Sequence, residues 1–216
     1  MDHQLLAEIL QSVADGQLAV PDAINKLRHL SFEDIEFAHV DHHRSLRKGF
    51  PEVIFGQGKT VDQVIGIMDK MTQQENILLV TRIEPEKADA VIARFPDAVY
   101  HPDARMVVWM LKKPEVIGRG TILIISAGTS DIPVAKEAFL TAQAMGNRVE
   151  TIFDVGVSGL HRLLGHQEAI LKASVLIVVA GMEGALPSVV AGMISRPVIA
   201  VPTSVGYGVS LGGLTA

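Results

Sequence analysis

The second half of the sequence alternates short apolar runs with helix-like segments, and this alternation constrains the fold more than any other feature. The predicted order is strand 121–126, helix 132–145, strand 148–154, helix 158–172, strand 175–180, helix 187–195 and strand 197–202. Continuous apolar strands separated by helices are typical of a parallel sheet covered on both faces. Ligands of such sheets bind beyond the carboxyl ends of the strands.

The first half predicts a smaller α/β unit that follows two amphipathic helices. The expected elements are helices at 4–14 and 21–30, a strand-like segment at 52–55, a helix from 60, a strand at 77–81, a helix at 85–95 and a strand-like pair within 98–111. Charge, Pro and Gly mark KKPEVIGRG at 112–120 as a linker. We therefore expect an N-terminal domain at 1–112, a linker at 113–120 and a parallel α/β domain at 121–216.

Composition and charge narrow the class of partner. The chain has 216 residues, of which 48% are hydrophobic, which is ample for a buried core. A formal net charge of −5 and the lack of a long Lys/Arg run disfavour non-specific nucleic-acid binding. The apolar runs are too short for a membrane helix, and the start MDHQLLAEIL has no basic leader segment. We expect a cytoplasmic protein with a small-molecule partner and neither a nucleic-acid nor a membrane partner.

The loop after the strand 121–126 predicts an anion site. Its residues Ser126 to Asp131 are mostly small, and they open a helix. N–H groups at a helix start lack intrahelical partners and carry the positive end of the helix dipole, so they stabilise a phosphate or carboxylate. We expect Ser130 or Asp131 to cap the helix and Pro133 to lie in its first turn. The plain alternative is a capped helix after a tight glycine turn.

Further loops at strand ends carry carboxylates and small residues. They span Asp154 to Ser158, Gly181 to Ala185 and Thr203 to Gly208. Glu183 stands between two glycines, where partial burial would suit it for general acid/base work. Its plain alternative is a carboxylate favoured by a helix N-terminus. His161 and Arg162 are either catalytic or members of an amphipathic helix face.

A basic segment in the first half suggests a pocket for phosphate or carboxylate, with a solvated basic loop as the alternative. Its members are Arg44, Arg47, Lys48 and Lys59. Gly58-Lys59-Thr60 resembles the tail of a P-loop, but Val53 stands where the first glycine is required. No strand is followed by G-x-G-x-x-G, so a Rossmann dinucleotide site is not predicted. The nearby histidines 39, 42 and 43 lack cysteines or a His-x-x-x-His helix, so we predict no dedicated metal site.

Several of these motifs resemble the PurE superfamily of aminoimidazole ribonucleotide carboxylases and mutases. The matching elements are Ser130-Asp131 and His161-Arg162. Where PurE proteins carry His-Leu-Pro-Gly, this chain has Ala185-Leu186-Pro187-Ser188, so the histidine is missing. This departure disfavours the purine reaction.

A resemblance to the LarB family covers nearly the whole chain. It rests on Asp41-His42-His43-Arg44, on Arg47-Lys48-Gly49-Phe50-Pro51-Glu52-Val53-Ile54-Phe55, on Gly58-Lys59-Thr60, and on SAGTSDIPVA, DVGVSGLHRL, AGMEGALPSVVAG and VPTSVGYG. It implies a PurE-like (flavodoxin/Rossmann-like) three-layer α/β core behind a smaller N-terminal α/β domain. It also implies the first step of nickel-pincer nucleotide cofactor synthesis: carboxylation of nicotinic acid adenine dinucleotide at C5 of its pyridinium ring and hydrolysis of its phosphoanhydride, giving pyridinium-3,5-biscarboxylic acid mononucleotide and AMP.

The resemblance distributes roles among the candidate residues. The expected catalytic residues are Glu183, Asp131 and His161. The expected substrate-binding residues are Ser126, Gly128, Thr129, Ser130, Asp131, Asp154, Gly156, Val157, Ser158, Gly181, Met182 and Gly184, with Arg44, Arg47 and Lys59 from the first domain. Expected co-reactants are CO2 or bicarbonate, with Mg2+ screening the phosphates but no ligand cage for it. By analogy with the family, we expect a homo-oligomer, and specifically an octamer.

The chemistry requires a nucleophile. In the LarB family it is a cysteine after the Gly-Gly-Leu-Thr-Ala stretch, and this 216-residue sequence has no cysteine and stops at Ala216, so we expect it to lack that segment. Two alternatives stay open: an aminoimidazole ribonucleotide carboxylase or mutase, and a nucleotide-binding module without turnover.

Overall fold

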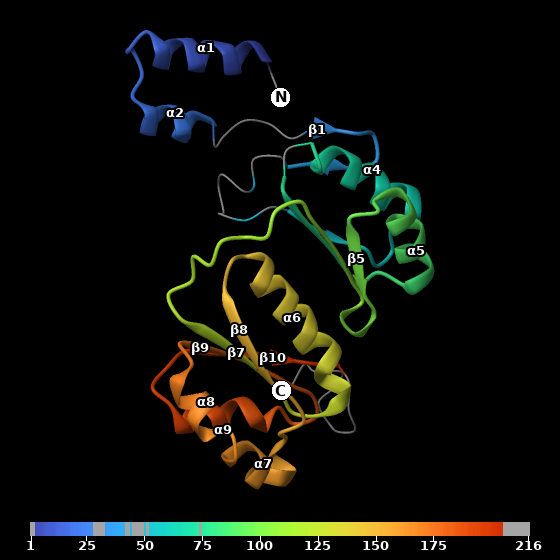
Figure 1. The fold of residues 1–216 in the computed structure, drawn as a ribbon, viewed down its shortest axis with the longest axis vertical. Helices are drawn as coiled ribbons and strands as arrows, with labels where there is room; N and C mark the ends of the chain where they lie inside the picture. Colours follow the sequence, from blue (N-terminus) through green and yellow to red (C-terminus); the bar gives the residue numbers. More distant parts are fainter. Residues whose placement is uncertain are drawn as a thin grey trace. The chain divides into compact units, whose positions relative to one another are not determined.

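The computed structural model describes residues 3–27, 33–41, 44, 50, 52–73 and 75–204. The chain divides into two compact units (Figure 1): the first is Met1–Tyr100 with Val107–Lys112, and the second is His101–Met106 with Lys113–Ala216. Over the described ranges, every helix is too short or too polar to cross a lipid bilayer.

The second unit is built on a four-stranded sheet in which every pair is parallel. The strand order is β10-β9-β7-β8, with β7 at Thr121–Ser126, β8 at Arg148–Ile152, β9 at Val175–Ala180 and β10 at Val198–Pro202. The register pairs Ser126 with Val179 and Pro202 with Ala180. The carboxyl ends of three neighbouring strands therefore lie at one edge of the sheet.

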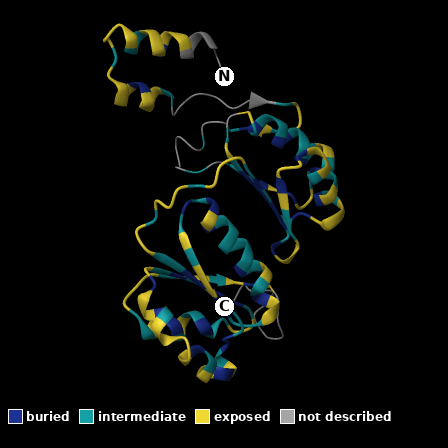
Figure 2. Ribbon diagram, viewed as in Figure 1, coloured by how far each residue is buried: buried dark blue, intermediate teal, exposed yellow. Residues whose placement is uncertain are grey.

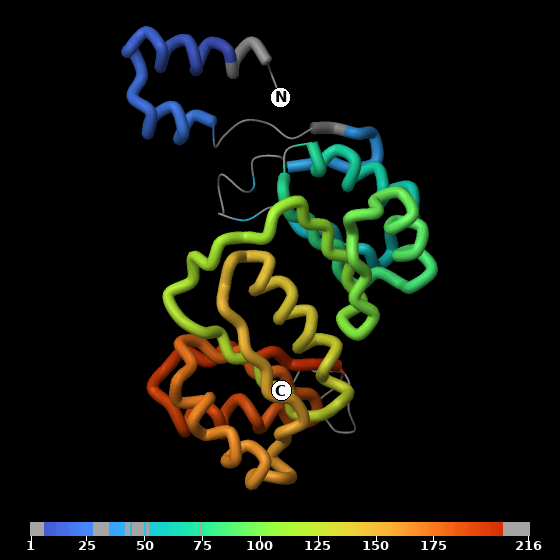
Figure 3. The backbone as a smooth tube through the Cα atoms, in the orientation of Figure 1, coloured from blue at the N-terminus to red at the C-terminus, as the bar shows by residue number. Residues whose placement is uncertain are grey.

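Helices cover both faces of this sheet, as the ribbon and the backbone tube show (Figures 1 and 3). The helix α6 (Ile132–Ala144) packs on one face through a small core that includes Ile124, Ala135 and Val179. The other face carries α7 (Leu160–Leu164), α8 (Gln167–Lys172) and α9 (Ala185–Met193) over a larger apolar core. The central strands β7 and β9 are largely buried, whereas the edge strands β8 and β10 are largely exposed or half-buried (Figure 2). This confirms the predicted three-layer α/β class.

The single helix predicted at 158–172 is wrong. The structure has a short 3-10 turn, η3 (Val157–Gly159), followed by α7 and α8 as separate helices. Gly165 ends α7, and His166 has φ −107° and ψ 17°, outside the helical region. Glycine is the ordinary residue with the weakest helix propensity apart from proline, which explains the position of the break.

The first unit holds a mixed sheet of order β3-β4-β6-β5. Its strands are β3 (Val53–Phe55), β4 (Ile77–Thr81), β5 (Ala98–His101) and β6 (Met106–Met110), and β3 is parallel to β4 whereas β6 is antiparallel to it. The helices α4 (Val61–Met71) and α5 (Pro85–Arg94) pack on this sheet over a buried core. A small ribbon of β1 (Glu33–Asp34) and β2 (His39–Val40) and two mutually packed helices, α1 (His3–Ala14) and α2 (Val20–Leu27), precede it.

The Gly58-Lys59-Thr60 segment starts a helix rather than a phosphate loop. The Thr60 hydroxyl accepts from the Gln63 N–H at 3.2 Å, and the Gln63 side-chain oxygen accepts from the Thr60 N–H at 3.0 Å. This reciprocal pair is a capping box for α4. Gly58 has φ +80°, the left-handed conformation that favours glycine.

Candidate functional site

Backbone hydrogen bonds tie the loops that follow β7, β8 and β10 to the carboxyl ends of neighbouring strands in the second unit. The Ala127 N–H donates to the Val179 carbonyl at 2.9 Å, and the Thr203 N–H donates to the Ala180 carbonyl at 3.1 Å. The Val155 N–H donates to the Ser126 carbonyl at 3.1 Å. The predicted residues of these loops therefore do come together at the carboxyl edge of the sheet, where ligands of such sheets bind.

The Asp131 carboxylate lies inside this edge. Its side chain is buried, at 4% exposed, and its two oxygens accept different bonds. The Gly128 N–H donates to Oδ2 at 2.9 Å, and the hydroxyl of buried Thr203 donates to Oδ1 at 2.7 Å. Asp131 is the N-cap residue of α6, as expected, but its side chain makes no capping hydrogen bond to that helix. Its carboxylate turns back into the preceding loop. Pro133 does lie in the first turn of α6.

Two N–H groups of this loop remain available to a ligand. Thr129 and Ser130 open the 3-10 turn η2 (Thr129–Asp131), so their N–H groups have no acceptor within the helix. No other residue in the described ranges accepts from them, and both residues are exposed. The helix dipole of α6 adds partial positive charge at this point. The loop thus offers donors to an anion while one buried carboxylate fixes its shape.

The loop after β8 is held against the loop after β7. Asp154 has φ +58°, and its N–H makes a long 3.4 Å bond to the Ser126 hydroxyl. Its carboxylate pairs with the Arg162 guanidinium at 2.7 Å, both side chains being more than a third exposed. A Cβ on Gly156 would lie 2.9 Å from the Ala127 carbonyl oxygen. Glycine at this position therefore permits the close approach of the two loops.

The loop after β9 presents Glu183 to solvent. Met182 and Gly184 both adopt the left-handed conformation, with φ +56° and +64°, and the Gly184 N–H closes a turn onto the Gly181 carbonyl at 3.1 Å. Glu183 lies within this tight turn, and the residue is exposed. The expected partial burial of Glu183 is therefore wrong for the single chain. Its position at the carboxyl edge of the sheet is as expected.

The remaining predicted residues of the second unit follow the Asp154 loop in the sequence. Val157 and Ser158 form η3 beside the Asp154 loop, and α9 contacts that turn. His161 is exposed on α7, and it is the neighbouring Arg162 that reaches Asp154. A catalytic role for His161 stays a prediction.

Of the predicted basic residues of the first unit, the structure describes Lys59 and Arg44, and the two have different surroundings. Lys59 lines a cavity of about 260 Å³ together with His39 and Glu52, and its carbonyl accepts from the Lys87 ammonium at 2.8 Å. Arg44 stacks over the Phe50 ring at 5.7 Å and does not line this cavity. Arg47 lies outside the described residues, as do Lys48, His42 and His43.

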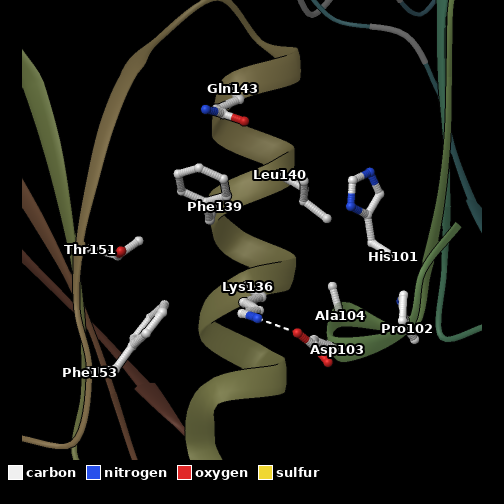
Figure 4. Close-up of a pocket in the computed structure, with 10 residues that line it drawn as sticks. All are labelled: His101, Pro102, Asp103, Ala104, Lys136, Phe139, Leu140, Gln143, Thr151 and Phe153. Carbon is white, nitrogen blue, oxygen red and sulfur yellow. Dashed lines mark hydrogen bonds and ion pairs between the residues drawn. The ribbon is translucent and has the colours of Figure 1, made fainter. Parts of the chain in front are cut away.

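A cavity of about 400 Å³ in the second unit contains none of the predicted site residues (Figure 4). It runs along α6, between β8 and the 3-10 turn η1 (Pro102–Ala104), and is lined by His101, Pro102, Asp103, Ala104, Lys136, Phe139, Leu140, Gln143, Thr151 and Phe153. Lys136 pairs with Asp103 across it. Burial lowers the pKa of His101, because desolvation disfavours the charged imidazolium.

The acidic side chains of the site do not form a metal cage. Across the described residues, no three side chains of the His, Asp or Glu type gather closely enough to hold an ion. Asp131 accepts hydrogen bonds on both of its oxygens, and Asp154 is paired with Arg162. These residues therefore do not fit a dedicated Mg2+ site, and we derive no step through that ion.

The sequence pattern did not identify Thr203 as an individual site residue. The sequence placed it at the start of a strand-end loop, but its hydroxyl reaches a carboxylate that is 72 positions away in the sequence. A threonine directly after an apolar parallel strand is the signal that could have identified it.

Comparisons with known proteins match two protein families to successive parts of this chain. Residues 32–112 match the LarB/PurE-like N-terminal domain family, and residues 121–215 match the AIR carboxylase family. An uncharacterized protein of Methanocaldococcus jannaschii is 38% identical over 214 residues, which are 95% of this chain and 84% of that protein. The N5-carboxyaminoimidazole ribonucleotide mutase of the same organism is 40% identical over 84 residues, which are 38% of this chain and 51% of that protein.

Proposed function

The chain belongs to the LarB/PurE-like family, whose domains indicate a carboxylase-related enzyme, and we propose that its substrate is nicotinic acid adenine dinucleotide. In this proposal the enzyme carboxylates C5 of the pyridinium ring and hydrolyses the phosphoanhydride. The products are pyridinium-3,5-biscarboxylic acid mononucleotide and AMP, which belong to nickel-pincer nucleotide synthesis.

The order of the two domain matches is the observation that favours this reaction over the purine reaction. A LarB/PurE-like N-terminal domain precedes the AIR carboxylase domain in this chain. The matched mutase aligns over only 84 residues. At the start of α9, Ala185 stands where the PurE motif has histidine, which removes a proton-transfer group expected for the purine reaction.

The carboxyl edge of the second sheet supplies groups that suit a charged nucleotide. The N–H groups of Thr129 and Ser130 suit a phosphate or the ring carboxylate, because they donate without a cation of their own. Arg162, fixed by Asp154, places a guanidinium at the same edge. We assign Ser126, Gly128, Gly156, Val157, Ser158, Gly181, Met182 and Gly184 to the walls of this site. In the first unit, Lys59 and Arg44 are the described candidates for nucleotide contact, and Arg47 is the further candidate.

The proposed carboxylation proceeds through a temporary adduct. A thiolate adds to the electron-poor pyridinium ring and converts it to a dihydropyridine, whose enamine carbon C5 then attacks CO2 to form the new carbon–carbon bond. A base removes the C5 proton, and the thiolate leaves with its electron pair, which restores the aromatic ring. Water then cleaves the phosphoanhydride. The family resemblance assigns the thiolate to a cysteine after the Gly-Gly-Leu-Thr-Ala stretch.

We assign the base to Glu183. The turn between Gly181 and Gly184 leaves Glu183 exposed at the substrate edge, and the glycine that directly follows it allows close approach to the backbone. General bases of this kind contribute about 10²- to 10⁴-fold to a rate. Glu183→Gln keeps the shape of the side chain and removes the basic oxygen.

The test of this role measures turnover of the dinucleotide by a chain that includes the family's cysteine segment. We expect Glu183→Gln to lower kcat at least about 100-fold. Glu168→Gln is the matched control: this exposed residue on α8 pairs with Lys172, and turnover should stay unchanged. Wild-type turnover in Glu183→Gln would remove Glu183 from the mechanism.

The alternative reaction is tested in parallel. The mutase relative favours activity on an aminoimidazole ribotide, so the same enzyme is offered N5-carboxyaminoimidazole ribonucleotide. Conversion of this compound, without conversion of the dinucleotide, would replace the proposal. Stabilisation by the dinucleotide without any product would instead favour a nucleotide-binding module.

A further inference from the structure

The strand β10 is tied to the anion loop by a buried pair of side chains that the proposed chemistry does not use. Thr203 and Asp131 are 5% and 4% exposed, and the threonine hydroxyl donates to Asp131 Oδ1 at 2.7 Å. The other carboxylate oxygen accepts from the Gly128 N–H at 2.9 Å. The Thr203 backbone is itself anchored, since its N–H donates to the Ala180 carbonyl at 3.1 Å.

We infer that Thr203 is a positioning residue for the anion loop of the proposed site. Its hydroxyl fixes the Asp131 carboxylate, and the carboxylate fixes the Gly128 N–H. The start of α6 is thereby held with the N–H groups of Thr129 and Ser130 directed at the substrate edge. This inference rests on the proposed function for the identity of the bound anion, but the positioning itself does not depend on it.

The same geometry gives Asp131 a structural role rather than a role in proton transfer. A carboxylate that is buried and bonded on both oxygens is poorly placed to exchange a proton with substrate. It instead supplies an acceptor to the buried Thr203 hydroxyl and to the part-buried Gly128 N–H. Glu183, exposed at the neighbouring loop, has no such restriction.

Removing the hydroxyl isolates the effect of this contact. Thr203→Val has nearly the same shape and leaves Asp131 Oδ1 without its buried donor, whereas Thr203→Ser keeps a hydroxyl. Thr81→Val is the matched control, because Thr81 is also buried, at 8% exposed, but belongs to β4 in the first unit. All variants are made in this 216-residue chain.

Two measurements follow the loop and the ligand separately. Hydrogen exchange with mass spectrometry measures the exchange rate of the loop amides in peptides covering 126–134. We expect this rate to be about tenfold higher in Thr203→Val, because hydrogen bonds to charged groups are among the stronger ones. Calorimetric titration with nicotinic acid adenine dinucleotide reports the site, and we expect Kd to rise about tenfold. Thr203→Ser should restore both values, and Thr81→Val should change neither.

The outcomes separate this inference from the proposed function. Unchanged exchange of peptides 126–134 in Thr203→Val would overturn the positioning role. Faster exchange with an unchanged Kd would also overturn it, because the loop would then not control the ligand. If the wild-type protein does not bind the dinucleotide at all, the substrate assignment fails, while faster exchange in Thr203→Val with rescue by Thr203→Ser still supports the positioning of the loop.

Discussion

Gly156→Ala should separate the two loops that build the candidate site. The backbone of Gly156 has φ −57°, which alanine adopts without strain, so the cost is steric alone. The new Cβ would lie 2.9 Å from the Ala127 carbonyl oxygen and 3.5 Å from its carbon, both backbone atoms. Reaching ordinary contact at 3.4 Å requires a movement of about 0.5 Å between the loops.

The expected loss of stability follows from two opposing effects. Overpacking of a tight site costs about 1–3 kcal/mol, whereas replacing glycine by alanine restricts the unfolded chain and returns about 0.4–1 kcal/mol. We therefore expect the free energy of unfolding to fall by about 1–2 kcal/mol. Urea denaturation followed by circular dichroism measures this change. Dinucleotide affinity should fall as well, because Ala127 leads directly into the Gly128–Asp131 loop.

Gly192→Ala is the matched control for this prediction. Gly192 lies in α9 with open space where its Cβ would be placed. Alanine favours a helix over glycine by up to about 1 kcal/mol, so this variant should be as stable as the wild type or more stable. If Gly156→Ala were equally stable, the close approach of Gly156 to Ala127 would not describe the folded protein, and the reasoning would be refuted.

Three further predictions concern other contacts. Arg162→Gln should lower the free energy of unfolding by less than about 1 kcal/mol in urea denaturation, because the pair with Asp154 is partly exposed to solvent; a loss of 3 kcal/mol would contradict this. Burial lowers the pKa of His101, so the unfolded chain binds a proton at this imidazole more readily than the folded chain does. The stabilising contribution of the neutral His101 is complete above about pH 6.5 and is lost as the pH falls below that value. The difference in the free energy of unfolding between pH 7.5 and pH 5.5 should therefore shrink in His101→Gln, and an unchanged difference would contradict the burial of His101. By family analogy we also propose a homo-oligomer, specifically an octamer; light scattering of the purified protein should give eight times the 23.2 kDa chain mass, and a monomer would contradict it.

Local patterns in the sequence determined much of the fold. The apolar runs at 121–126 and 175–180 are strands as predicted, because a strand buried on both faces needs continuous apolar residues. The sequence also predicts that the strand ends lie together, since parallel strands place their carboxyl ends at one edge of the sheet. The sequence alone therefore groups the loops of Ser126, Asp154 and Gly181.

Features that depend on distant residues could not be read in the same way. The bond between Thr203 and Asp131 joins a strand end to a loop 72 positions earlier, and no local pattern indicates such a pair. The exposure of Glu183 follows from the two left-handed residues that flank it, and one of them is Met182, a residue type that rarely adopts that conformation. The break at Gly165 falls within a segment whose apolar spacing continues on both sides of it.

The central claim is that this protein carboxylates a pyridinium dinucleotide, and isotope transfer tests it most directly. The protein, and a version extended through the family's cysteine segment, are incubated with nicotinic acid adenine dinucleotide, ¹³C-bicarbonate and Mg2+, and the products are analysed by mass spectrometry. The account predicts that the extended protein forms AMP and a mononucleotide that carries one ¹³C carboxyl group. If neither protein changes the dinucleotide, the proposed reaction is wrong.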